Sequence, residues 1–112
     1  MSDRSAQAPL FVDGMALARW LLGRFGGSPG QLEQQIVSVS LDLLQAITLA
    51  LKDRRRDEQI ELADEMLIRL RVLLRLAMDC GRLTPEQYGH VLGRVDAIGR
   101  QLGGWQRSLG PV

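Results

Sequence analysis

Residues 66–81 constrain the fold most, because this stretch is too apolar for an ordinary surface helix. At about 100° per residue, two apolar stripes lie side by side along it and along the turn before it. The first stripe comprises Ile60, Ala63, Leu67, Leu70, Leu74 and Ala77; the second comprises Leu62, Met66, Leu73 and Cys80. A helix with two adjacent apolar stripes needs two neighbours, so this stretch predicts the centre of a helical bundle.

Ile68 and Val72 lie outside both stripes, in the same arc as Arg71, Arg75 and Arg82. A monomeric bundle would leave these two apolar side chains in water. Contiguous exposed apolar surface is uncommon on soluble monomers. We therefore expect a partner subunit to cover Ile68 and Val72.

Composition favours an all-α class and a single domain. The chain has 112 residues, of which 46% are hydrophobic but only 4% aromatic, and the apolar set is mostly Leu, Val, Ile, Ala and Met. The N-terminus lacks a signal-peptide pattern and no 18-residue stretch is free of charge, so we expect a cytoplasmic protein without a membrane span. A single cysteine, Cys80, makes a metal site or disulfide unexpected and is predicted to pack as a small hydrophobe.

Charge is distributed unevenly along the chain. Residues 1–65 carry a net charge of −3 and residues 66–112 a net charge of +4, and thirteen of the fourteen basic residues are arginine. Arginine binds phosphate and carboxylate groups with two parallel hydrogen bonds more readily than lysine does. A GC-rich genome and solvated helix faces explain the same pattern equally well.

Four helices are expected within residues 10–109, after a disordered lead-in over residues 1–9. The first helix covers residues 10–25. Its apolar stripe is predicted to comprise Phe11, Met15, Ala18, Leu22 and Phe25, broadened by Leu17, Trp20 and Leu21. Ser28-Pro29-Gly30-Gln31 has the pattern of a capping box and predicts that the second helix begins at Pro29 and runs to about Lys52. Its apolar face comprises Leu32, Ile36, Val39, Leu43, Ile47 and Ala50.

The last two helices flank a short turn. The basic run in residues 52–56 precedes the third helix and is interpreted as a soluble turn rather than a nucleic-acid site. Gly81 is predicted at the position after the third helix, and Thr84-Pro85-Glu86-Gln87 is a second capping box. The fourth helix then has a stripe of Tyr88, Val91, Val95, Ile98, Leu102, Trp105 and Leu109. Short connections make this an up-down-up-down four-helix bundle.

Glycines are unusually frequent in the fourth helix, where each costs up to about 1 kcal/mol relative to alanine. Close approach of another backbone would explain the pairs Gly89/Gly93 and Gly99/Gly103, whereas a frayed helix end would explain Gly103-Gly104. With Ile68 and Val72, we assign Gly89 and Gly93 to a candidate oligomer interface.

Three segments carry a resemblance to a known family: residues 70–77 (LRVLLRLA), 79–88 (DCGRLTPEQY) and 98–105 (IGRQLGGW). In this combination they resemble the accessory variability determinant proteins of diversity-generating retroelements. The similarity spans the second to fourth helices and is strongest over residues 70–108.

The resemblance implies a four-helix bundle that assembles into a barrel-like homopentamer. It also implies binding to the retroelement's reverse transcriptase and to its template-repeat RNA, without catalysis by the bundle itself. Arginines on the third helix contribute to partner binding in that family, and the matching positions are Arg71 and Arg75. The candidate set for binding reverse transcriptase or RNA is Arg71, Arg75, Arg82 and Arg100.

Enzymatic activity is not expected, because the sole histidine, His90, has no nucleophile or carboxylate at a useful spacing and no phosphate-binding glycine loop is present. No cofactor is expected either. The leading hypothesis is an oligomeric adaptor in mutagenic retrohoming. The alternatives are an interaction scaffold of the type encoded in ribosomal-RNA intervening sequences, and a helical protein-interaction module that binds no RNA.

Overall fold

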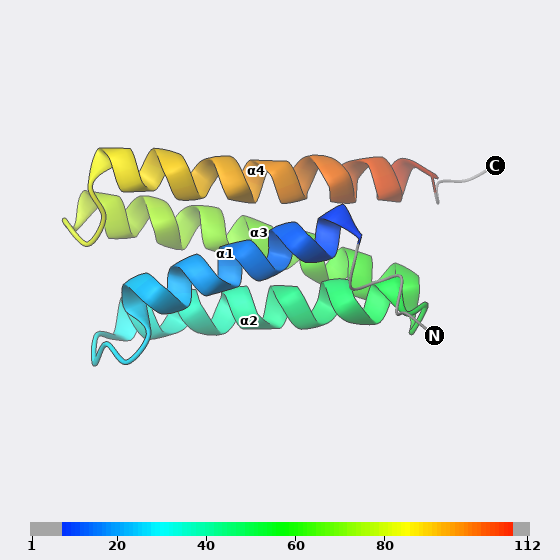
Figure 1. Ribbon diagram of the computed structural model, residues 1–112, viewed down its shortest axis with the longest axis horizontal. Helices are drawn as coiled ribbons and strands as arrows, with labels where there is room; N and C mark the ends of the chain where they lie inside the picture. The colour runs from blue at the N-terminus through cyan, green and yellow to red at the C-terminus, as the bar shows by residue number, and fades with distance from the viewer. Residues whose placement is uncertain (1–7, 109–112) are drawn as a thin grey trace.

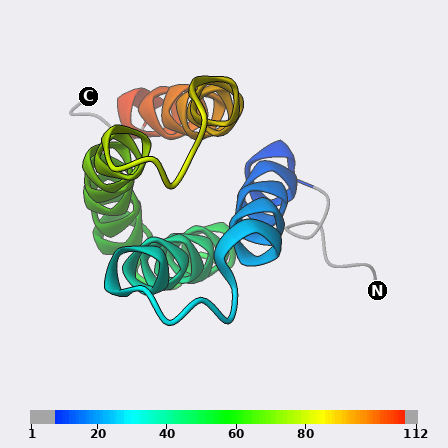
Figure 2. The same ribbon diagram turned by 90° about the vertical axis from the view of Figure 1, so that its left-hand side faces the viewer.

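The computed structural model describes residues 8–108, which form four α-helices and no strands. The helices are α1 (Pro9–Phe25), α2 (Gln31–Leu51), α3 (Arg56–Asp79) and α4 (Pro85–Ser108). They run antiparallel in chain order, and each packs on the helices before and after it, with α1 also against α4 (Figures 1 and 2). The predicted all-α class and four-helix bundle are confirmed. Helix α1 begins one residue before the predicted start, with Ala8 as its N-cap. Residues 1–7 of the expected lead-in and Leu109 of the predicted fourth-helix stripe lie outside the described residues.

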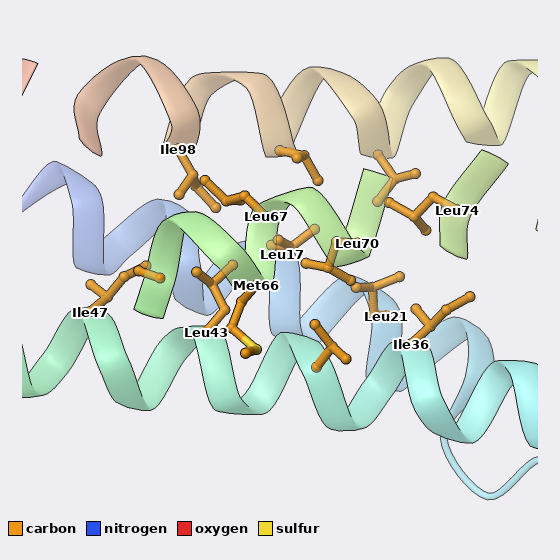
Figure 3. Close-up of a cluster of buried hydrophobic side chains, with 14 of the residues drawn as sticks. Leu17, Leu21, Ile36, Leu43, Ile47, Met66, Leu67, Leu70, Leu74 and Ile98 are labelled. Atoms are coloured by element: carbon orange, nitrogen blue, oxygen red, sulfur yellow. The ribbon is translucent and has the colours of Figure 1, made fainter. Parts of the chain in front are cut away.

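The core consists of one apolar stripe from each helix (Figure 3). Every residue of the first stripe predicted for α3 is buried, from Ile60 to Ala77. The predicted faces of α2 and α4 also point inward, with Leu32, Tyr88 and Trp105 partly buried at their ends. The spacing of three and four residues was therefore sufficient to orient these three helices.

Helix α1 is rotated within the predicted stripe, toward the side of Leu17 and Leu21 that broadens it. Its buried positions are Leu10, Gly14, Leu17, Ala18, Leu21 and Phe25. Leu22, predicted in the core, is 43% exposed. The cause is Gly14, where an added Cβ would lie 3.3 Å from Leu44 Cδ1 and 3.4 Å from Ile47 Cδ1. The glycine lets α1 approach α2 closely and so turns the Gly14 side of the helix inward.

The second stripe predicted for α3 is only partly correct. Met66 is buried and Leu73 is partly buried, but Leu62 is 39% exposed. Cys80 is exposed, contrary to the prediction that it packs in the core. It lies at the C-cap of α3, where its N–H donates the last hydrogen bond of the helix, to the Leu76 carbonyl at 2.9 Å.

The turn between α3 and α4 forms as predicted. Gly81 has a φ of +76°, and the N–H groups of Gly81 and Arg82 donate to the carbonyls of Met78 and Ala77. These two bonds define a Schellman motif. In the following capping box, the Gln87 N–H donates to Thr84 Oγ1 at 3.1 Å and the Thr84 N–H to Gln87 Oε1 at 3.0 Å.

The predicted capping box at Ser28 does not form. Helix α2 begins at Gln31 with Gly30 as its N-cap, two residues after the predicted start. Ser28 Oγ instead accepts from the Gly30 N–H at 3.2 Å and donates to Glu33 Oε2 at 3.1 Å. The sequence pattern predicted that the Ser28 hydroxyl caps the backbone of α2. Instead, this hydroxyl donates to the Glu33 carboxylate.

Helix α2 is the described helix whose length and apolar composition would allow it to cross a membrane. The core helix of a soluble bundle satisfies the same criterion. In this structure α2 packs between α1 and α3, and its inward face is part of the core.

Candidate partner-binding surface

The side chain of Arg71, a residue of α3, reaches across to α4. Its Nη2 donates to Asp96 Oδ1 at 3.2 Å, and the two side chains are 41% and 47% exposed. Gly99 makes room for the guanidinium, because an added Cβ there would lie 2.9 Å from Arg71 Nη2. The predicted close approach at Gly99 is therefore made by a side chain rather than by another backbone.

Arg75 lies one turn further along α3 and is more accessible. Its Nε donates to Asp79 Oδ1 at 3.2 Å within the same helix, and both side chains are more than half exposed. Pairs of this kind contribute only about 0.3–0.5 kcal/mol. A phosphate or a partner's carboxylate can replace Asp79 at little cost.

Arg82 does not lie in the arc of α3 that it was predicted to share with Arg71 and Arg75. It lies in the turn after α3, and its Nη1 is 3.5 Å from Oε2 of Glu33 on α2. The carbonyl of Arg82 accepts from Arg24 Nη2 at 2.9 Å, which ties the end of α1 to the same turn. We call the side chains of Arg24, Ser28, Glu33 and Arg82 the bundle-end network.

The carboxylate of Glu33 is the buried centre of this network, with a side chain only 8% exposed. Gly30 leaves the space it occupies, since a Cβ at that position would overlap Glu33 Oε2. Among the described residues, Glu33 Oε1 has no hydrogen-bond partner. The network therefore gives Arg82 a structural role in joining three elements at one end of the bundle.

Arg100 differs from the other three candidates. It is exposed on α4 and forms no ion pair with any residue in the range 8–108. Arg69 on α3 and Arg107 near the end of α4 are equally exposed and lack an ion pair within that range. The structure thus brings Arg71 and Arg75 together, but places Arg82 at the bundle end and Arg100 on another helix.

The residues predicted for an oligomer interface are all at the surface. Ile68 and Val72 are 56% and 64% exposed, and Leu76, which the prediction did not include, is 47% exposed. Gln35 and Leu73 line a shallow hollow beside Ile68 and Val72. At Gly89 and Gly93 an added Cβ would meet nothing within 4 Å, so no described helix makes the predicted close approach there.

The contacts of His90 and the remaining acidic side chains complete the polar surface of the described chain. His90 is exposed; its ring centroid lies 5.6 Å from that of Trp20, and its Nε2 accepts from Arg94 Nε at 3.2 Å. Within residues 8–108 no three His, Cys, Asp or Glu side chains are placed to hold a metal ion. Sequence reasoning missed Glu33, the one buried carboxylate in that range. The feature of the sequence that could have indicated the burial of Glu33 is its position between Leu32 and Ile36, on the inward face of α2.

No curated protein and no solved structure resembles the chain closely enough to count as a match. A family model described as bAvd-like does match, over residues 21–109. This range includes the end of α1, all of α2 and α3, and the described part of α4. The match agrees with the four-helix bundle and with the resemblance carried by residues 70–105. The chain therefore belongs to the bAvd-like family.

Proposed function

We propose that this protein is a non-catalytic accessory subunit of a diversity-generating retroelement. It binds the reverse transcriptase and the template-repeat RNA as an oligomeric adaptor, a homopentamer in the cytoplasm, during mutagenic retrohoming. The observation that carries this proposal is the family match over residues 21–109. The arginine edge formed by Arg71 and Arg75 supports it, because guanidinium groups suit both phosphate and carboxylate partners.

The two arginines of this edge are available to a partner because their present ion pairs are weak. Asp79 and Asp96 are about half exposed, and solvent screens both pairs. A backbone phosphate of RNA carries one negative charge, as a carboxylate does, but its binding also releases condensed counterions, which favours the exchange at low salt. Arg82 contributes to the fold through the bundle-end network. A substitution of Arg82 would therefore change stability as well as binding, and the two effects could not be separated.

Assembly of several subunits makes these weak arginine contacts sufficient to hold RNA. One subunit offers two arginines on this edge, which would hold RNA weakly at physiological salt. An oligomer repeats the edge in each subunit, so that later contacts form at a high effective concentration. The adaptor can then hold the RNA and the polymerase together without a deep binding site.

The test replaces Arg71 and Arg75 with glutamine. Glutamine removes both positive charges without placing a second carboxylate beside Asp96, as Arg71→Glu would. We expect the Arg71→Gln/Arg75→Gln protein to remain folded and oligomeric but to lose at least about tenfold in capture of tagged reverse transcriptase with its template RNA, the effect of losing about 1.4 kcal/mol.

The matched control is Arg54→Gln/Arg55→Gln, which removes the same charge from the turn between α2 and α3. Capture by this control should stay near the unmodified level. Equal capture by the two double variants would show that the edge has no specific role. Capture of neither polymerase nor RNA by the unmodified protein would contradict the proposed function.

A further inference from the structure

Two side-chain contacts join α1 to α4 and leave a hollow between them. At one end, the ring of Trp20 on α1 lies 5.6 Å, centroid to centroid, from the imidazole of His90 on α4. At the other end, Gln101 Nε2 of α4 donates to Asp13 Oδ2 of α1. Figure 2 shows the two helices at neighbouring corners of the bundle. We call the space between these contacts the α1–α4 hollow.

The α1–α4 hollow has a volume of about 310 Å³ and is lined by Asp13, His90, Gly93, Arg94 and Ala97. This volume is at the lower end of the range for small-molecule sites, about 300–1,000 Å³. Gly93 and Ala97 fill little of the space, and an added Cβ at Gly93 would meet nothing within 4 Å. The hollow therefore has room for a planar ring system.

Asp13 and Arg94 have opposite charges and line the same hollow, but they do not form an ion pair. Neither side chain belongs to any ion pair within residues 8–108. Arg94 Nε donates to His90 Nε2 at 3.2 Å, and its two Nη groups have no acceptor among the described residues. Asp13 accepts from Gln101 and keeps further acceptor sites, because a carboxylate has about four. A carboxylate and a guanidinium thus remain available to one ligand.

The neighbouring charges on the two helices are engaged elsewhere or point away. Arg24, on the same side of α1, donates from Nη2 to a backbone carbonyl of the turn after α3 at 2.9 Å. Asp96 lies on the α3 side of α4 and pairs with Arg71. Arg19 lines a different hollow, on the outer side of α1. With one negative and one positive charge, the α1–α4 hollow suits a neutral polar ligand better than an anion or a cation.

Guanine is the RNA base whose hydrogen-bonding groups match this arrangement. Its N1–H and N2 amino group are adjacent donors, which a carboxylate accepts together. Its O6 and N7 are adjacent acceptors, to which arginine donates two hydrogen bonds. Adenine and cytosine place an acceptor beside the amino donor, and uracil has acceptors on both sides of its N–H, so each would bring a lone pair against Asp13. The imidazole of His90 offers a face for stacking.

We propose that the α1–α4 hollow binds a single unpaired guanine base. Asp13 accepts from N1 and N2, Arg94 donates to O6 and N7, and His90 stacks on the ring. Trp20 is a positioning residue, since it contacts the His90 ring from α1. The inference rests on the proposed function, in which the base belongs to a single-stranded part of the RNA. A free guanine nucleotide offers the same chemistry, so the test includes both sources.

The test compares two short labelled oligouridines by fluorescence anisotropy, one with a central guanosine and the other with a central inosine. Inosine lacks the N2 amino group, so the hydrogen bonds to Asp13 decrease from two to one. The unmodified protein should bind the guanosine oligonucleotide about tenfold more tightly, the effect of one hydrogen bond to a charged group. Asp13→Asn should abolish this preference, because an amide has one acceptor oxygen where the carboxylate has two.

Asp42→Asn is the matched control, since Asp42 is an exposed carboxylate of α2 that belongs to no ion pair of the described chain. This control should keep the full preference for guanosine. Equal binding of the two oligonucleotides by the unmodified protein, or a preference that persists in Asp13→Asn, would overturn the proposal. The first comparison requires no variant, so it does not depend on how a substitution affects folding.

Calorimetric titration with guanosine monophosphate identifies the source of the base. Binding as tight as that of the guanosine oligonucleotide supports a site for the free nucleotide, whereas tighter binding of the oligonucleotide supports a base within RNA. Absence of binding by both ligands overturns the proposal. These measurements involve neither the reverse transcriptase nor Arg71 and Arg75. Failure of the guanine site therefore leaves the adaptor proposal standing, and guanine binding can be detected even if capture of the polymerase fails.

Discussion

Two exposed glycines, Gly81 and Gly89, have no neighbour that an added Cβ would touch. They differ in backbone conformation. Gly81 has a φ of +76° in the Schellman motif after α3, whereas Gly89 lies within the regular helix α4. L-residues other than glycine are strained at positive φ, but alanine is the better residue inside a helix. The same substitution should therefore have opposite effects at the two positions.

Gly81→Ala should lower the free energy of unfolding by about 1 kcal/mol, and Gly89→Ala should raise it by about 0.5–1 kcal/mol. Urea denaturation followed by circular dichroism measures both. Both variants are compared with the unmodified chain at the same low protein concentration, so that association affects all three measurements alike. A change of the same sign at both positions would contradict the assigned backbone roles.

Glycine also limited what could be predicted from the sequence at this scale. Gly81 was identified because it stands between a long apolar helix and a capping box. Gly14 was not recognised as a contact, since a residue without a side chain adds nothing to an apolar stripe. Its position against Leu44 and Ile47 depends on α2, and these two residues lie thirty or more residues further along the chain.

At the scale of the elements, long helices with clear periodicity were predicted well. Helices α3 and α4 were oriented correctly because their buried residues repeat at three and four positions over several turns. Helix α1 has apolar residues on most sides, so its pattern left the orientation open and packing against α2 decided it. The start of α2 was misplaced because Ser28 binds Glu33, a partner that the capping pattern does not consider.

The bundle-end network predicts different roles for two arginines that the sequence treated alike. Arg82→Ala leaves the buried Glu33 carboxylate without its cation and should cost about 1–2 kcal/mol of unfolding free energy. Arg75→Ala removes an exposed pair within one helix and should cost less than about 0.5 kcal/mol. Urea denaturation at low protein concentration distinguishes them.

Glu33→Gln in the Arg82→Ala protein is the control, since it removes the buried charge that has lost its partner. It should recover part of the lost stability. If Arg82→Ala and Arg75→Ala cost the same, the bundle-end network does not stabilise the fold.

At the scale of the whole molecule, the sequence predicted more than one subunit without showing how subunits meet. Ile68 and Val72 could be recognised as unpartnered because they lie outside both apolar stripes. Leu76 was missed because it lies close to the second stripe in angle.

The central claim is that repeated arginine edges let an oligomer hold RNA that one subunit cannot hold. Fluorescence anisotropy of a labelled template-repeat RNA, titrated at several salt concentrations, tests it directly. The unmodified protein should bind tightly at low salt and lose affinity steeply as salt rises, because many phosphate contacts release many counterions. The Arg71→Gln/Arg75→Gln chain should bind weakly with a shallower salt dependence, because each subunit has lost two of the positive charges that contact phosphate. No binding by the unmodified protein at low salt, or equal slopes for the two proteins, would contradict the claim.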